Sequence, residues 1–113
     1  MVNSRSKGKR GELEWAKYLR DQLGLDARRG QQFSGSPDSP DVVGGFANTH
    51  CEVKRVERLN VDNAMEQAVA DCGNATPYVA HRKNRAEWLI TVRAIDLLAF
   101  AKSVVTTMDR SDG

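Results

Sequence analysis

The chain of 113 residues is poor in cysteine, histidine and aromatic residues, and it has no long hydrophobic run. Its two cysteines, Cys51 and Cys72, form neither a CxxC pair nor a cysteine-histidine cluster. We therefore expect free core thiols rather than a disulfide or a zinc site. No apolar run approaches the roughly 18 to 20 residues that a transmembrane helix needs. The basic start, MVNSRSKGKRGE, is followed by no apolar segment, so it does not resemble a secretory signal, and we expect a cytoplasmic protein.

What the chain does have is unevenly placed positive charge. The formal net charge is only +2, and the hydrophobic fraction of 40% is ordinary for a globular protein. The length suits one domain, residues 1–113, with residues 1–6 and 109–113 as flexible tails. Most cations fall into four basic clusters, at residues 5–10, 28–29, 54–58 and 81–85. Four such clusters on a small domain favour a phosphate-binding surface.

The first predicted element is a helix from about Gly8 to Leu23, ended by Gly24. Its helical periodicity places four residues on one apolar face: Trp15, Ala16, Leu19 and Leu23. Glu12 falls in the middle of that face, whereas Glu14 points to solvent, as do Lys17, Tyr18 and Asp21. A lone buried carboxylate costs several kcal/mol. Glu12 therefore either lies near solvent at the end of the face or has a partner such as a metal or a lysine.

Further along, strands are predicted at residues 25–30, 42–46 and 50–56, with a loop rich in serine, proline and aspartate before the second. We expect Val42-Val43 and residues 50–56 to form an antiparallel hairpin. A second helix begins with Asp62 or Asn63 as cap and ends at Gly73. Strands at 77–83 and 87–93 and a helix from Ala94 or Ile95 complete the order α, β, β, β, α, β, β, α. This order predicts one α/β domain.

The strand CEVKR carries the candidate chemistry. Residues two apart in a strand share a face, so Glu52 and Lys54 point the same way while Cys51 and Val53 point into the opposite layer. Asp41 precedes the neighbouring predicted strand and can come beside Glu52. Two close carboxylates repel each other unless a divalent cation lies between them, and Mg²⁺ or Mn²⁺ suits such oxygen ligands. A lysine beside the cation can orient an attacking water or neutralise charge on a phosphate.

These residues resemble the motifs of the PD-(D/E)xK nuclease superfamily: Glu12, then Pro40-Asp41 with two valines, then Glu52-Val53-Lys54. Within it, three stretches look most like archaeal-type Holliday-junction resolvases and their phage-encoded relatives. They are KGKRGELEWAKYLRDQLGL, SGSPDSPDVVGG and CEVKR. The resemblance implies a restriction-endonuclease-like α/β core with a central mixed sheet flanked by helices.

The resemblance also implies roles for individual residues. Asp41 and Glu52 would bind the metal, helped by the backbone carbonyl of Val53, and Lys54 would assist the water nucleophile. Glu12 would bind or orient the metal, directly or through water. Candidate contacts to DNA phosphates are Lys9, Arg10, Arg28, Arg29, Ser34, Ser36 and Arg55. Gln67 is left out of the predicted site, because it falls opposite the apolar face of its helix, which comprises Met65, Val69 and Cys72. His81 is left out as well, because a lone histidine in a basic strand is more often a surface or phosphate-contacting residue.

The expected function is that of a Mg²⁺-dependent endodeoxyribonuclease of the crossover-junction type, with Mn²⁺ as a substitute, in a bacterial, archaeal or phage-infected host cell. It would act on branched or duplex DNA, with no membrane partner. Two symmetric cuts need two sites related by a twofold axis, so we expect a homodimer, with residues 88–105 as its candidate surface. Two alternatives stay open: a nicking, flap or restriction-like phage nuclease, and a non-catalytic nucleic-acid-binding module.

Overall fold

The computed structural model of the chain describes residues 4–30 and 42–111. Its elements, in chain order, are α1 (Ser4–Leu23), β1 (Arg28–Arg29), β2 (Val42–Val43), β3 (Thr49–Arg55), α2 (Val61–Asp71), β4 (Thr76–Arg82), β5 (Leu89–Thr91), the 3₁₀ turn η2 (Ala94–Asp96) and α3 (Leu97–Ser111). The predicted α/β class and order of elements are therefore confirmed. The first helix starts earlier than predicted, at Ser4 rather than near Gly8, and the last helix continues to Ser111.

Three strands form a mixed sheet in the order β3-β4-β5, in which β3 and β4 are parallel and β5 is antiparallel to β4. A separate antiparallel pair joins β1 to β2. The predicted hairpin between Val42-Val43 and residues 50–56 is wrong, because β2 pairs with β1 and β3 pairs with β4 within the described ranges. Strands that follow each other in the chain need not pair: α2 provides the long crossover that lets β3 pair in parallel with β4, and the two residues of β2 pair with β1 instead.

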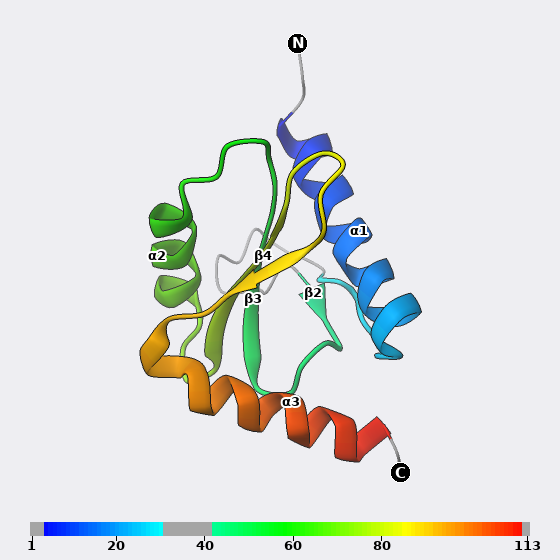
Figure 1. The fold of residues 1–113 in the computed structure, drawn as a ribbon, viewed down its shortest axis with the longest axis vertical. Coiled ribbons are helices and arrows are strands. Elements are labelled where there is room, and N and C mark those ends of the chain that lie inside the picture. Colours follow the sequence, from blue (N-terminus) through cyan, green and yellow to red (C-terminus); the bar gives the residue numbers. More distant parts are fainter. Residues whose placement is uncertain (1–3, 31–41, 112–113) are drawn as a thin grey trace.

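The sheet lies between helices (Figure 1), with α1 and α2 on either side of it in that view and α3 crossing below. On one face, Cys51 and Val53 of β3 pack with Tyr78 and Ala80 of β4 and with the apolar face of α1. On the other face, Val79 packs with α2. The two faces of β3 therefore meet different helices, and this division decides which side chains can meet near Glu52.

The apolar face of α1 agrees with the prediction except at its end. Trp15, Ala16 and Leu19 are buried, but Leu23 is half exposed. The helix ends at Gly24, which has a φ of +69°, and the amide of Leu25 then donates to the carbonyl of Leu19 over 3.1 Å. This is the hydrogen-bond pattern of a glycine-ended helix, and it turns Leu25 onto the core in place of Leu23.

Helix α2 differs from the prediction in both its cap and its buried face. Its N-cap is Asn60, whose side chain accepts from the amide of Asn63, rather than Asp62 or Asn63 itself. The buried residues are Ala64 and Ala68, because these small side chains let the helix approach Val79 closely. Over residues 4–30 and 42–111, none of the helices has the length and apolarity needed to cross a bilayer.

Candidate active site and metal centre

Glu52 and Lys54 lie on one face of β3, the face that α2 covers. The carboxylate of Glu52 is almost completely buried, with 5% of the residue exposed, whereas Lys54 is partly exposed. The Lys54 Nζ lies 3.5 Å from Glu52 Oε1, so a buried negative charge has an ammonium group beside it. Such a carboxylate is suited to bind a divalent cation, and the partly exposed lysine beside it can contact a phosphate that arrives from solvent.

Gln67 of α2 also reaches this face. Its Oε1 accepts a hydrogen bond from Lys54 Nζ over 3.4 Å, so Lys54 is held between a carboxylate and an amide. Sequence reasoning left Gln67 out because it assumed the wrong buried face of the helix. The spacing of Ala64 and Ala68, four residues apart, is the signal that places Gln67 towards the sheet.

Two further residues that the sequence analysis did not select lie beside Glu52. The donor atoms of His50, Glu52 and Asp71 all lie within 4.8 Å of one another, and His50 and Glu52 are both buried. An imidazole nitrogen and two carboxylates form a donor set that fits a divalent cation. His50 precedes Glu52 by two residues, so strand alternation alone could have placed it on this face.

Three residues are predicted to hold or assist a metal together with Glu52, and two of them, Glu12 and Val53, are among the described residues. Asp41 lies outside them, so its approach to Glu52 stays a prediction. Glu12 is partly buried on α1, which packs against the opposite face of β3. Val53 lies in β3 with its side chain in the core. The roles predicted for Glu12 and for the Val53 carbonyl stay predictions.

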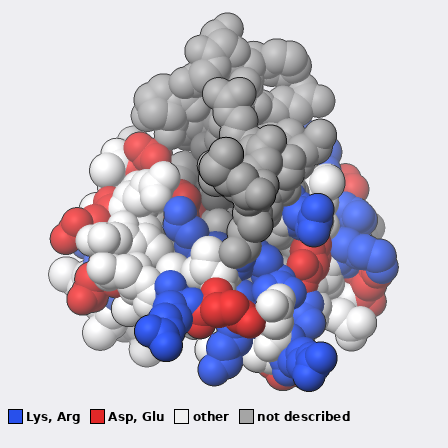
Figure 2. All heavy atoms as spheres, turned by 90° about the horizontal axis from the view of Figure 1, so that it is seen from above, with Lys and Arg blue, Asp and Glu red and all other residues white. Residues whose placement is uncertain are grey.

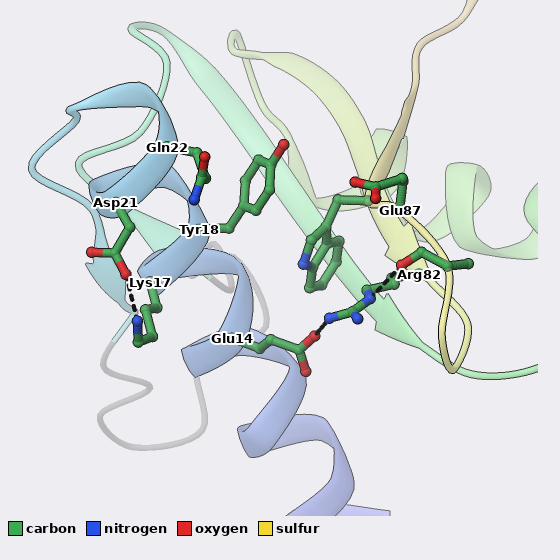
Figure 3. A pocket seen from close by; sticks show the side chains of 9 residues that line it. Glu14, Lys17, Tyr18, Asp21, Gln22, Arg82 and Glu87 are labelled. Atoms are coloured by element: carbon green, nitrogen blue, oxygen red, sulfur yellow. Dashed lines mark hydrogen bonds and ion pairs between the residues drawn. The ribbon is translucent and has the colours of Figure 1, made fainter.

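Glu14 does not face water as predicted. It accepts from Nε of Arg55 over 3.2 Å and forms an ion pair with Arg82, which Figure 3 shows reaching from the sheet to α1. Arg55 and Arg82 are partners in the register of β3 and β4, so one carboxylate is shared by two adjacent guanidinium groups and offsets only one of their two charges. The predicted phosphate contact of Arg55 would have to compete with this ion pair, because the residue lies on the α1 face of the strand.

A pocket of about 310 Å³ opens beside this ion pair, between α1 and the connection from β4 to β5 (Figure 3). Its lining residues are Glu14, Lys17, Tyr18, Asp21, Gln22, Arg82, Ala86, Glu87 and Trp88. Neither Glu52 nor Lys54 contributes to it. The pocket is therefore separate from the candidate active site.

Three of the four basic clusters meet at one end of the molecule, where α1 begins and β3 and β4 end. Seen from above, Figure 2 shows Lys and Arg side chains gathered on this end, interrupted by acidic groups. Arg10, Arg55 and Asn84 line one hollow there, so clusters distant in sequence adjoin in space. Arg10 and Arg28 are exposed, Arg28 on β1. Ser34 and Ser36 lie outside the described residues, and the side chains of Lys9 and Arg29 are not described.

His81 lies opposite Lys54 in the register of β3 and β4, and its Nε2 is 2.8 Å from Thr91 Oγ1. Burial lowers the pKa of its imidazole below the ordinary value of 6.5. His81 is therefore mainly neutral at pH 7 and adds little to the positive charge of this end.

Comparisons with known proteins agree with this arrangement. No protein-family model and no curated protein sequence matches the chain. Among solved structures, the chain is similar to Hjc, a Holliday junction resolvase from the archaeal hyperthermophile Archaeoglobus fulgidus, with 32% sequence identity and a TM-score of 0.53. The match covers 76% of this chain and 72% of that chain, and it confirms the restriction-endonuclease-like core. The chain therefore belongs to the family of archaeal-type Holliday-junction resolvases within the PD-(D/E)xK nuclease superfamily.

Proposed function

We propose that the protein is a metal-dependent DNA endonuclease that resolves four-way junctions. The observation that carries this proposal is the buried carboxylate of Glu52 with the Lys54 ammonium 3.5 Å away, in a chain of the resolvase family. The metal would be Mg²⁺, with Mn²⁺ as a substitute, held by Asp41, Glu52 and the Val53 carbonyl and assisted by Glu12. When bound, such an ion lowers the pKa of a coordinated water and offsets charge on the phosphate.

The residues around Glu52 have separate tasks in this proposal. Glu52 provides a fixed negative charge whose burial strengthens its attraction for a cation. Lys54 would donate a hydrogen bond from its ammonium group. A bond to the attacking water would orient it, and a bond to a phosphate oxygen would strengthen as negative charge develops there. Gln67 is a positioning residue, because its amide oxygen holds the Lys54 ammonium at 3.4 Å without neutralising it.

DNA would bind across the end of the molecule where the basic clusters meet. Lysine and arginine contacts to phosphates give an affinity that falls as salt rises and that depends little on base sequence. The predicted contacts of Lys9, Arg10, Arg28, Arg29, Ser34, Ser36 and Arg55 belong to this proposal. Junction selectivity then depends on how two such surfaces are arranged.

Substrate choice tests the proposed activity. We expect cleavage of a four-way junction in Mg²⁺ to be at least about tenfold faster than cleavage of a linear duplex or a flap of the same sequence, since only the junction presents two symmetric strands to two sites. Gel-resolved cleavage of the three substrates at equal concentration measures this. Equal cutting of all three would favour the nicking, flap or restriction-like alternative.

We propose that the protein acts as a homodimer through aliphatic side chains in its C-terminal part. Trp88 and Phe100 of the predicted surface pack against the core instead. The exposed side chains are Leu89, Ile90, Ile95, Leu97, Leu98 and Val105. Leu98 is 83% exposed, so Leu98→Glu should shift the protein from dimer to monomer in light scattering with little effect on folding. Leu13→Glu, at an exposed position of α1, is the matched control, and a dimer unaffected by Leu98→Glu would place the interface elsewhere.

A further inference from the structure

His50, Glu52 and Asp71 come from two elements that meet at one end of the α2 face. His50 and Glu52 stand two positions apart on β3, and Asp71 is the last residue of α2. Their donor atoms lie within 4.8 Å of one another. Ligand atoms on a tetrahedral Zn²⁺ with bonds of about 2.1 Å lie about 3.4 Å apart. The side chains therefore need to close by up to about 1.4 Å to share a cation, which rotation about their side-chain bonds can provide.

The charges of this group favour a cation. Glu52 and Asp71 are two carboxylates at short range, and Lys54 Nζ lies 3.5 Å from Glu52. A cation between two carboxylates offsets their repulsion, and the burial of Glu52 strengthens its attraction for the cation, because water screens it less. The imidazole of His50 is a ligand that Mg²⁺ rarely uses, whereas Zn²⁺ and the other later divalent metals bind it readily.

We propose that His50, Glu52 and Asp71 form a second cation site, which takes an imidazole-binding divalent metal such as Zn²⁺. The site is not the Asp41–Glu52 pair of the proposed nuclease centre, because two of its three ligands, His50 and Asp71, have no part in that pair. Glu52 belongs to both, and each of its two carboxylate oxygens can serve one ion. The binding of metal here does not rest on the proposed function, whereas its effect on cleavage does.

The histidine content of the chain makes the test direct, because the sequence contains only His50 and His81. We expect Zn²⁺ titration of the full chain, followed by NMR of the imidazole groups, to shift the His50 resonances and to leave those of His81 in place. His81 is the internal control, since it lies on the neighbouring strand and contacts Thr91. His50 resonances that do not move at millimolar Zn²⁺, or that move together with those of His81, would overturn the site.

A pair of matched variants extends this test. Asp71→Asn should weaken Zn²⁺ binding at His50 by at least about tenfold, since loss of even an outer-shell partner costs this much. Glu66→Gln removes one charge from an exposed position of the same helix and should leave the affinity unchanged. If Asp71→Asn binds Zn²⁺ as the wild type does, the three residues form a hydrogen-bonded structural cluster and not a metal site.

A cleavage assay provides the second measurement, which tests whether Glu52 is a ligand of both metal sites. Zn²⁺ at a concentration that saturates His50 should change the Mg²⁺ concentration needed for half-maximal cleavage in the wild type, and this response should be lost in Asp71→Asn. An unchanged Mg²⁺ requirement with His50 occupied would refute the shared ligand. If the wild type cleaves no DNA in Mg²⁺, the proposed nuclease function fails, while the NMR titration still decides the metal site.

Discussion

Replacing Glu52 with glutamine is expected to lower the rate of junction cleavage about 1,000-fold, which corresponds to about 4 kcal/mol of transition-state stabilisation. Glutamine keeps the size of the side chain but removes the buried negative charge that would hold the metal and that Lys54 approaches at 3.5 Å. Junction binding should be retained, because the phosphate contacts come from basic residues elsewhere. Cleavage under single-turnover conditions and gel-shift binding without Mg²⁺ measure the two properties separately.

The neighbouring acidic residues provide the comparison for this result. Asp41→Asn should lose cleavage as Glu52→Gln does, because both are proposed ligands of the same ion. Asp38→Asn should be tolerated, since Asp38 lies three residues before Asp41 in the Ser-, Pro- and Asp-rich stretch that precedes β2. Glu66→Gln, on the exposed side of α2, should also cut at the wild-type rate. If Asp41→Asn and Glu52→Gln cleave like the wild type, these carboxylates are structural and do not hold the catalytic metal. A wild type that binds junctions but cuts none of them would instead be a binding module.

Gly44→Ala is expected to destabilise the fold by about 2–5 kcal/mol. Gly44 follows β2 directly and has a φ of +77°, a conformation that costs a residue with a Cβ about 1–2 kcal/mol. A Cβ built there would lie 2.0 Å from the carbonyl oxygen of Asp26, so the backbone would also have to shift, which adds about 1–3 kcal/mol. Urea unfolding monitored by circular dichroism measures the change in the free energy of unfolding.

Gly24→Ala separates the two causes in this prediction. Gly24 has a similar φ of +69°, but a Cβ there would meet nothing within 4 Å. Its replacement should therefore cost only about 1–2 kcal/mol, the conformational part alone. Equal destabilisation by the two variants would show that the contact with Asp26 is unimportant. Because Gly44 fixes the path of β2, Gly44→Ala should also slow cleavage, if Asp41 enters the site from that strand.

Helix α2 shows why part of the site was hidden from sequence reasoning. Its large apolar residues, Met65 and Val69, predicted one buried face, but the helix packs through Ala64 and Ala68. Small residues carry a weak hydrophobic signal, and yet they allow the closest approach to a sheet. The predicted face placed Gln67 away from the sheet, whereas in the structure its side chain accepts a hydrogen bond from Lys54.

Glu14 shows a second kind of limit. Helical periodicity correctly placed Glu14 off the apolar face that Trp15 and Leu19 form, and from there it was expected to reach solvent. Its partners, Arg55 and Arg82, are 41 and 68 residues away in the chain. Local periodicity predicts which side of a helix a residue occupies, but it does not predict which side chains from distant parts of the chain contact that residue.

The sequence by itself determined the order of the elements, the end of α1 at Gly24 and the shared face of Glu52 and Lys54, because turn residues and the two-residue period of a strand are local properties. Only the tertiary structure decided that β3 pairs in parallel with β4, that Asp71 arrives beside His50 and Glu52, and that three basic clusters meet at one end. Each of these depends on how segments distant in the chain pack together. That packing is decided by the shape and burial of whole surfaces, which no short stretch of sequence contains.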